Sequence, residues 1–441
     1  MKKRFAICST IVLLLLLSAC GAPQTLDFSY APEGEELSSL MVETSQTHRA
    51  ELEHVPSAAD FADAISDDPA SAGLLSESEV ESLLRGHAAM ETVSKEQAQS
   101  DVSLLFRTLQ SAYGAYEYFG QEKFDAAEDA VTQWLSSQDD EIKVSALGEK
   151  LQESLAFMLA HDAHAVIYEP AAEEIEAQVR YKYFFADGFY FSKDVNGSYY
   201  MVNDGERWTL SSFSDEHVSV QPTLLQDGRI VYQPTLFALR KDAVQSSVTL
   251  KNSSGKAKIY RLDWTESQPL DVDLGTLDYR LIQEDGLTYV SLRSFVSGTY
   301  DNMLARYARE GAKARGSKAV IYDLRGNVGG SDSWPRKWIQ SFLGTQNSIE
   351  TSMLYAQKNS ALFAAENSES LLPEDEGTCF AREVHGTWYE NDIPIIVLVD
   401  DHCGSSGEGA VQLLKTLDNV LVVGSNTAGY QLCGNISTFT L

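Results

Sequence analysis

The second half of the chain contains apolar runs of strand length that alternate with helix patterns. Ala319–Leu324, Ile393–Val399 and Val420–Val423 are mostly apolar, which suits strands that are buried on both faces. A helix pattern follows an earlier strand pattern and covers Asp301–Gly311. Strands and helices that alternate in this way indicate an α/β layer. We therefore expect residues 276–441 to form an α/β core.

Two further patterns divide the chain before this core. In residues 98–168, apolar side chains recur at spacings of three and four, which predicts a small helical N-terminal domain. In residues 169–275, short alternating runs are separated by Asp-Gly and Asn-Gly turns, which predicts a β-rich middle domain. The expected fold class is therefore mixed, α+β with an α/β C-terminal part.

The N-terminus has the pattern of an export signal. A basic start is followed by the apolar run Ile11–Leu17 and by small residues before Cys20. This pattern resembles a bacterial lipobox, so we expect residues 1–19 to be a signal peptide and Cys20 to carry a lipid anchor on the extracytoplasmic face of the cell membrane. An ordinary signal with an incidental cysteine is the alternative. Residues 20–97 are acidic and poor in apolar clusters, which predicts a flexible spacer with a short helix near Glu79–Arg85.

Charge and cysteine content limit the partners and the cross-links. The formal net charge is −30, and such an acidic surface repels phosphate backbones, so nucleic acid is not an expected partner. Beyond Cys20 the chain has three cysteines, Cys379, Cys403 and Cys433, and an odd number leaves one thiol unpaired. A bridge between Cys403 and Cys433 stays open, because the sequence does not determine connectivity.

The first motif that could carry chemistry is Asp-Leu-Arg-Gly-Asn-Val-Gly-Gly at Asp323–Gly330. It follows a buried strand and precedes a helix. Glycines at such a turn let backbone amides approach a ligand, as in an oxyanion hole. A tight strand-to-helix turn without further function would leave the same pattern.

The second motif is Cys-Gly-Ser-Ser-Gly-Glu-Gly at Cys403–Gly409. It also lies between a buried strand and an amphipathic helix. At this junction the hydroxyl of Ser405 could be an exposed nucleophile, with helix amides facing a developing oxyanion. Ser405 or Ser406 could equally serve as a helix N-cap.

Taken together, the two motifs resemble those of the C-terminal-processing and tricorn-core serine peptidases, and Val423–Gly429 matches the Val-Gly-x-x-Thr-x-Gly segment of that family. The resemblance implies a ββα, crotonase-like peptidase core, with Ser405 as nucleophile. It also implies oxyanion donors from Ser406 and from Gly329 or Gly330, and no cofactor. For the middle domain it implies a PDZ-like module, although the usual carboxylate-binding loop is not visible.

The same resemblance bears on the general base. One branch of the family has a lysine directly after Thr-x-Gly, where this chain has Tyr430. The histidine branch has Asp-x-His at the end of its helical region, and here Asp162–His164 matches it, so the resemblance implies His164 as base. A neutral imidazole suits proton transfer near neutral pH. His161 is expected at the surface, and a metal pair of His161 and His164 would lack a third ligand.

The resemblance leaves the orienting acid of the base outside the sequence, beyond Leu441, and the final Phe439–Leu441 looks like part of a strand. We therefore expect a truncated chain with reduced activity. The expected function is a membrane-anchored serine endopeptidase that cleaves exported or extracellular proteins. The alternative is a non-catalytic ligand- or peptide-binding lipoprotein on the same scaffold, like the interphotoreceptor retinoid-binding proteins. A purely structural envelope protein is a third, weaker hypothesis.

Overall fold

The computed structural model describes residues 36–86, 90–168, 181–186, 188–203, 205–225, 227–239, 246–266, 279–298, 300–366, 375–434 and 438–439. The chain divides into two compact units, one of Met1–Leu40 with Tyr181–Gln268 and the other of Met41–Arg180 with Pro269–Leu441. Within the described ranges, no helix combines the length and the apolar character needed to cross a bilayer. The signal region and Cys20 lie outside these ranges.

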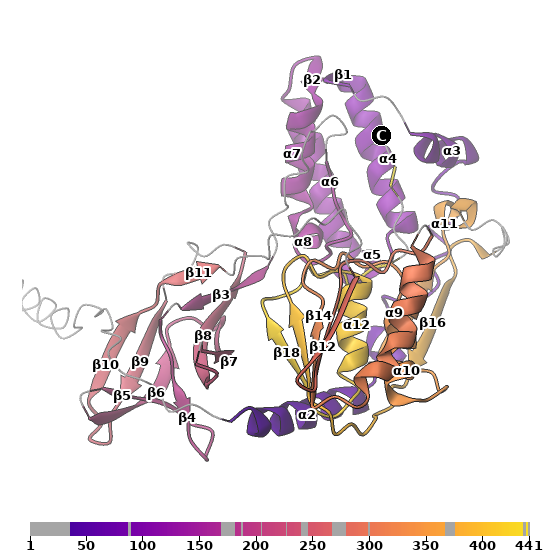
Figure 1. Cartoon of the computed structure of the whole chain (residues 1–441). Helices are drawn as coiled ribbons and strands as arrows, with labels where there is room; N and C mark the ends of the chain where they lie inside the picture. Colours follow the sequence, from indigo (N-terminus) through magenta and orange to yellow (C-terminus); the bar gives the residue numbers. More distant parts are fainter. Residues whose placement is uncertain are drawn as a thin grey trace, which may run out of the picture. The chain divides into compact units, whose positions relative to one another are not determined.

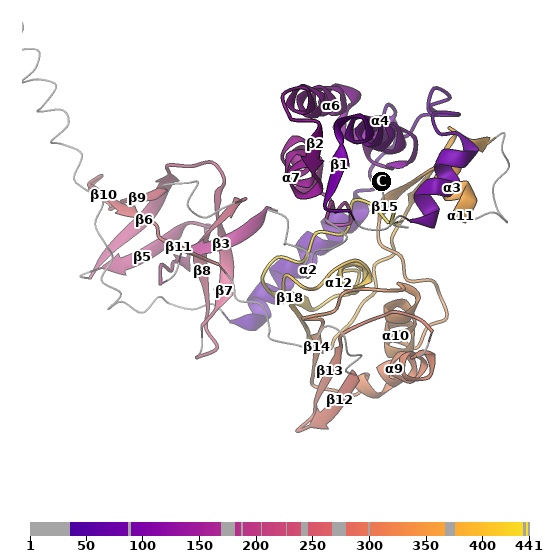
Figure 2. The ribbon, with the colours of Figure 1, turned by 90° about the horizontal axis from the view of Figure 1, so that it is seen from above.

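The larger unit contains the predicted helical region. Its elements are β1 (Thr92–Ser94), α4 (Lys95–Ala112), α5 (Tyr116–Phe119), α6 (Gln121–Ser136), β2 (Glu141–Lys143), α7 (Val144–Ser154) and α8 (Ala156–Leu159). Helix α4 begins where the hydroxyl of Ser94 accepts the amide of Gln97, 3.1 Å away, as a serine N-cap does. The apolar faces of α4, α6 and α7 meet in one cluster that includes Val102, Phe124 and Leu151. In Figure 2 the three helices are seen nearly end-on and side by side.

The N-terminal segment of the same unit differs from its expectation as a spacer. It forms α2 (Leu37–Glu53), which belongs to this unit from Met41 on, the 3₁₀ helix η1 (Ala58–Phe61) and α3 (Glu77–Arg85). The predicted helix near residue 80 is confirmed, and a capping box of Ser76 and Glu79 starts it. The rest of the segment is held by residues far along the chain. Ser45 accepts the amide of Asn419 at 2.9 Å, and the amide of Asp68 donates to the carbonyl of Gly377 at 2.7 Å.

The smaller unit is the predicted β-rich region. Its strands are β3 (Lys182–Ala186), β4 (Ser192–Lys193), β5 (Tyr199–Asn203), β6 (Glu206–Phe213), β7 (Val218–Leu224), β8 (Ile230–Ala238), β9 (Ser247–Lys251), β10 (Ala257–Arg261) and β11 (Trp264–Glu266). They form a five-stranded sheet, β10-β9-β6-β5-β4, and a four-stranded sheet, β11-β3-β8-β7. The side chains of Phe184, Phe191 and Trp208 belong to one shared core. Between Lys182 and Glu266 the helices and strands that the structure describes are all strands.

The C-terminal part of the larger unit is the predicted α/β core. Its sheet has the order β12-β13-β14-β17-β18, from strands β12 (Tyr279–Glu284), β13 (Leu287–Leu292), β14 (Ala319–Asp323), β17 (Ile395–Val399) and β18 (Val420–Gly424). The β12–β13 pair is antiparallel and the other pairs are parallel. Helices α9 (Asp301–Ala314), α10 (Ser333–Leu343) and α12 (Ser406–Leu414) share a core with this sheet (Figure 1). The three apolar runs of the sequence are therefore strands, as predicted.

One hairpin connects the helical region with this core. It consists of β15 (Met353–Lys358) and β16 (Cys379–Val384), and the short helix α11 (Ala361–Glu366) follows β15. The side chain of Lys358 is only 7% exposed. Its ammonium forms an ion pair with Glu117 and donates to the carbonyl of Gln110 at 2.8 Å. Because a buried lysine needs such partners, this contact fixes the end of α4 against the hairpin.

Candidate active site

Both sequence motifs lie at one edge of the core sheet. β13, β14, β17 and β18 run parallel, so the loops that follow them leave the sheet on the same side. In open α/β sheets this carboxyl edge is where ligands bind. The loop after β14 carries Asp323–Gly330, and the loop after β17 carries Ser405. The structure thus brings together two motifs that the sequence separates.

Ser405 occupies a strained backbone position at the start of α12. Its φ of 52° and ψ of −121° lie outside the regions that side-chain-bearing residues normally adopt. Such a sharp turn between a buried strand and a helix is the geometry of a nucleophile elbow. Ser405 is half-buried. It is also the N-cap residue of α12, which means that the two alternatives from the sequence coincide at one position.

The glycine turn lies directly against Ser405. Gly329 has a φ of +100°, and a Cβ atom built on it would lie 2.7 Å from Cβ of Ser405 and 3.0 Å from the amide nitrogen of Ser406. Gly330 has a φ of +138°, and a Cβ there would lie 2.1 Å from the carbonyl carbon of Phe295. Only glycine fits at either position, because any side chain would require the backbone to move. Ser406 reinforces the contact, since its hydroxyl donates to the carbonyl of Gly330 at 2.9 Å.

The two glycine amides differ in their environment. The amide of Gly329 donates to Oδ1 of Asn327 at 2.9 Å, and Gly329 is buried. Gly330 is exposed. Within the described part of the chain, its amide and that of Ser406 have no hydrogen-bond acceptor. The resemblance left open whether Gly329 or Gly330 donates to the oxyanion. An amide that is already bonded to Asn327 is not available to a substrate, so the geometry favours Gly330 as the donor.

Asn327 and Asp323 hold the glycine turn in place. The buried side-chain amide of Asn327 donates to the carbonyl of Leu292 at 2.8 Å. The main-chain carbonyl of Asn327 accepts the amide of Gly404 at 2.9 Å. Asp323 is fully buried. Burial opposes its ionisation, but hydrogen bonds from Arg325, Arg293 and Tyr289 outweigh burial and lower the pKa of the carboxyl to about 2.

Glu408 is a functional residue that sequence reasoning left without a role. Its side chain is 4% exposed, and Oε1 accepts the hydroxyl of Thr427 at 2.5 Å and the amide of Gly429 at 2.8 Å. Oε2 accepts the amide of Tyr430 at 2.8 Å and that of Ser405 at 3.1 Å. One carboxylate therefore joins the start of α12 to the segment after β18. The only signal in the sequence was the glutamate of Ser-x-x-Glu.

His164 reaches the same edge from the helical region. The amide of Ala163 donates to the carbonyl of Gly429 at 3.2 Å, which docks the Asp162–His164 turn onto the segment after β18. The His164 ring meets the Tyr430 ring edge-on, with 4.6 Å between centroids. Tyr430 in turn packs on Gly404, where an added Cβ would lie 2.6 Å from Cδ2 of the tyrosine. One aromatic ring thus separates His164 from the residue before Ser405.

Asp162 fixes the turn that carries His164. Its carboxylate is fully buried, accepts the amide of His164 at 3.0 Å and accepts the hydroxyl of Tyr113 at 2.9 Å.

Cys433 contacts the carboxylate of Asp162, and burial, followed by the charge of Asp162, raises the pKa of its thiol. Cys403, by contrast, is buried behind the nucleophile turn. Both are free thiols, so the Cys403–Cys433 bridge that the sequence left open does not form.

Several expected contacts are not made. Among the described residues, no hydrogen bond joins Ser405 to His164, and Nδ1 of His164 is buried without a partner. His161 is exposed, as expected. In the described ranges one group of side chains, Asp400 to His402, is close enough together to hold a metal ion, and it includes none of the predicted catalytic residues.

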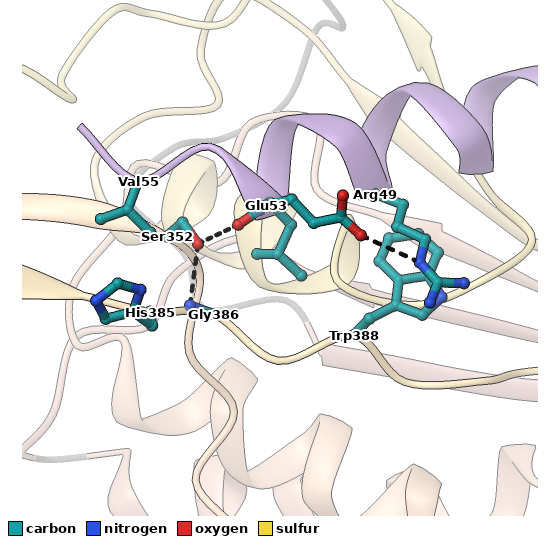
Figure 3. Close-up of a pocket in the computed structure, with 8 residues that line it drawn as sticks. Arg49, Glu53, Val55, Ser352, His385, Gly386 and Trp388 are labelled. Carbon is teal, nitrogen blue, oxygen red and sulfur yellow. Dashed lines mark hydrogen bonds and ion pairs between the residues drawn. The ribbon is translucent and has the colours of Figure 1, made fainter. Parts of the chain in front are cut away.

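A second serine and histidine line a hollow between α2 and the 385–388 segment (Figure 3). The hollow has a volume of about 180 Å³ and contains Ser352 and His385. The Ser352 hydroxyl donates to the carbonyl of Leu52 and accepts the amide of Gly386 at 3.0 Å. Because these bonds serve to fasten α2, Ser352 is a structural residue and not a rival nucleophile.

Comparison with known proteins bears on the family. Residues 286–440 match the model of Peptidase family S41. This region is a family S41 peptidase domain. The resemblance drawn from the motifs is thereby confirmed, and the chain carries the core of a serine peptidase. The match contains the glycine turn, Ser405 and Glu408, whereas His164 lies before it.

Several solved structures are similar to this chain at low sequence identity. Mature CPAF is 13% identical, with a TM-score of 0.39 and coverage of 76% of this chain and 84% of that one. The photosystem II D1 C-terminal processing protease is 13% identical, with a TM-score of 0.30 and coverage of 76% and 82%. A lipoprotein from Streptococcus agalactiae is 13% identical, with a TM-score of 0.27 and coverage of 78% and 80%. No curated protein sequence matches the chain. With such low TM-scores, the family assignment depends on the S41 match and the motifs.

Proposed function

We propose that this S41 protein is a membrane-anchored serine endopeptidase that hydrolyses exported or extracellular proteins through an acyl-enzyme at Ser405. The observation that carries the proposal is the strained turn at Ser405, which lies against the Gly329–Gly330 turn. Strain of this kind persists where the surrounding structure enforces it, and it collects at catalytic positions. A serine that served only as a helix cap would not need it.

In the proposed reaction, Oγ of Ser405 attacks the scissile carbonyl carbon while His164 takes its proton. The negative charge moves to the carbonyl oxygen, where the amides of Gly330 and Ser406 stabilise it. The protonated imidazole then gives its proton to the leaving amine, and water hydrolyses the acyl-enzyme by the same steps. We assign the donor role to Gly330 because the amide of Gly329 is engaged by Asn327.

His164 is the proposed base because its turn is docked at this edge by two independent contacts, the bond from Ala163 to Gly429 and the Tyr430 ring. Among the described residues no hydrogen bond joins this imidazole to Ser405. Catalytic hydrogen bonds often close only once substrate is bound. The buried Nδ1 of His164 is the atom that an orienting acid would contact.

The test is labelling of the full chain with a fluorophosphonate probe, followed by identification of the modified residue. We expect labelling at Ser405, none in Ser405→Ala, and a rate at least tenfold lower in His164→Asn. A folded wild-type chain that is not labelled would favour the ligand-binding alternative. Full labelling of His164→Asn would remove only the assignment of the base.

The membrane anchor and the extracytoplasmic location rest on the signal pattern before Cys20. Fractionation of cells that express the wild-type chain and Cys20→Ala tests them. We expect the wild-type chain in the membrane fraction and the variant outside it. Equal distribution of the two proteins would refute the anchor and leave the peptidase proposal intact.

A further inference from the structure

We propose that Tyr430 is a positioning residue of the peptidase, whose ring holds the His164 imidazole at the nucleophile turn. The inference rests on the proposed function, because it assigns a role toward the base named there. It concerns the position where the other branch of the family has a lysine. In this chain the position carries an aromatic ring instead of an amine.

The backbone of Tyr430 is fixed relative to Ser405 by a shared acceptor. Oε2 of the buried Glu408 receives the Tyr430 amide at 2.8 Å and the Ser405 amide at 3.1 Å. The segment before Tyr430 is also attached to the nucleophile turn, because the amide of Ala428 donates to the carbonyl of Cys403 at 2.8 Å. The backbone of Tyr430 is therefore attached directly to the nucleophile turn.

One side of the Tyr430 ring is packed on the nucleophile turn. A Cβ on Gly404 would lie 2.6 Å from Cδ2 and 2.9 Å from Cε2 of the ring. The glycine before Ser405 therefore gives the ring a flat surface of backbone, and no larger residue leaves room for it. The ring is half-buried in this place. Contact with Gly404 sets the direction in which the ring points.

The Tyr430 ring also contacts the base. The His164 imidazole meets it at an interplanar angle of 68° with 4.6 Å between centroids, an edge-to-face pair. Pairs of this kind have a preferred geometry and are stronger than contacts of equal area between aliphatic groups. Among the described residues, Nδ1 of the His164 ring is buried without a hydrogen-bond partner, so no bond at that atom fixes the imidazole. Tyr430 thus supplies orientation that a carboxylate supplies in other serine hydrolases.

This role predicts that the ring matters and that the hydroxyl does not. Tyr430→Phe keeps the edge-to-face pair, whereas Tyr430→Leu keeps only apolar contact. We expect Tyr430→Leu to lower the maximal labelling rate of Ser405 about tenfold, with the half-saturating probe concentration unchanged, because a misoriented base slows the chemical step. We expect Tyr430→Phe to stay within about twofold of wild type.

The experiment measures saturation kinetics of fluorophosphonate labelling on the full chain, with thermal unfolding of each variant as a check on the fold. Tyr118→Leu, which removes an exposed ring from the helical region, is the matched control. Tyr430→Met fills a similar volume without a ring and replaces the leucine variant if that variant unfolds. A lower rate in both aliphatic variants, with recovery in Tyr430→Phe, supports the inference.

Three results would overturn it. Wild-type rates in the aliphatic variants would show that the ring does not position the base. Faster labelling in these variants would show that the ring screens Ser405. A phenylalanine variant as slow as the leucine variant would assign the effect to the hydroxyl. In each case the wild-type chain is labelled at Ser405, so the proposed function stands. Absence of wild-type labelling removes both proposals together.

Discussion

Replacement of Glu408 by glutamine tests how the two halves of the site are joined. Four donors lie within 3.1 Å of the carboxylate, two at each oxygen, and the side chain of Gln431 is a fifth at 3.5 Å from Oε2. Glutamine has the same shape but only one acceptor oxygen. If that oxygen takes the place of Oε2, the bonds from Ser405 and Tyr430 remain. The new NH₂ group then donates to the hydroxyl of Thr427, which can reverse its role, and leaves the amide of Gly429 unsatisfied.

The size of the effect follows from these bonds. One unsatisfied buried donor costs about 1–3 kcal/mol, and each of three remaining bonds weakens by about 1 kcal/mol when its partner becomes neutral. Easier burial of a neutral group offsets part of this loss, so we expect a destabilisation of about 2–4 kcal/mol. The loss is concentrated in the segment after β18.

Two measurements check this expectation. Hydrogen exchange of the Gly429 and Tyr430 amides should accelerate roughly 30- to 900-fold, which is the same free energy expressed as a rate ratio. Urea unfolding should show how much of the destabilisation lowers the free energy of global unfolding. Glu390→Gln, at an exposed position, is the control and should match wild type. Unchanged exchange at Gly429 and Tyr430 in the Glu408 variant would refute the role of this carboxylate in joining α12 to the segment after β18.

Two further changes test other parts of the structure. Gly329→Ala places a Cβ 2.7 Å from Cβ of Ser405 at a φ of +100°, so it should destabilise the fold by about 1–3 kcal/mol and abolish labelling of Ser405. The control is Gly148→Ala, within α7 and with open space around it, which should stabilise the fold by up to about 1 kcal/mol. Calorimetry measures both changes in stability. The second change concerns pH. Burial, followed by the charge of Lys415, lowers the pKa of His48 from 6.5 to about 4, so the unfolded chain binds more protons between these values and stability falls as the pH drops through them. The free energy of unfolding measured in urea should fall by about 2–3 kcal/mol between pH 7 and 4.5. His48→Leu should remove this fall. An equal fall in both proteins would contradict the assignment to His48.

Local patterns predicted the elements whose partners are close in sequence or whose burial is complete. β14, β17 and β18 follow from their apolar runs, and the helical region follows from its periodicity. α2 was missed because its buried residues, such as Leu40, Met41 and Leu52, are separated by polar stretches. Its partners lie more than 350 positions away in some cases, as for Ser45 and Asn419. No local signal can report such a contact.

The site was predictable in its parts but not in its connections. The motifs named Ser405 and the glycine turn, and the backbone geometry explains why these residue types are required there. The engaged amide of Gly329 was not visible, because it depends on the rotamer of Asn327. Tyr430 entered the sequence argument only as a missing lysine. Its contact with His164 depends on how the helical region docks, which spacing along the chain does not encode.

The long-range attachment of α2 has a consequence for the order of assembly during synthesis. Ser45 leaves the ribosome 374 residues before its partner Asn419, a delay of about 20–75 s at bacterial and eukaryotic elongation rates. The other partners of α2 are also distant, since Ser352 follows its partner Leu52 by 300 residues. The helix therefore stays without its docking surface for most of that interval. A chaperone that shields this helix would shorten the exposure, and the proposed active site would be completed only after the segment that follows β18 has emerged.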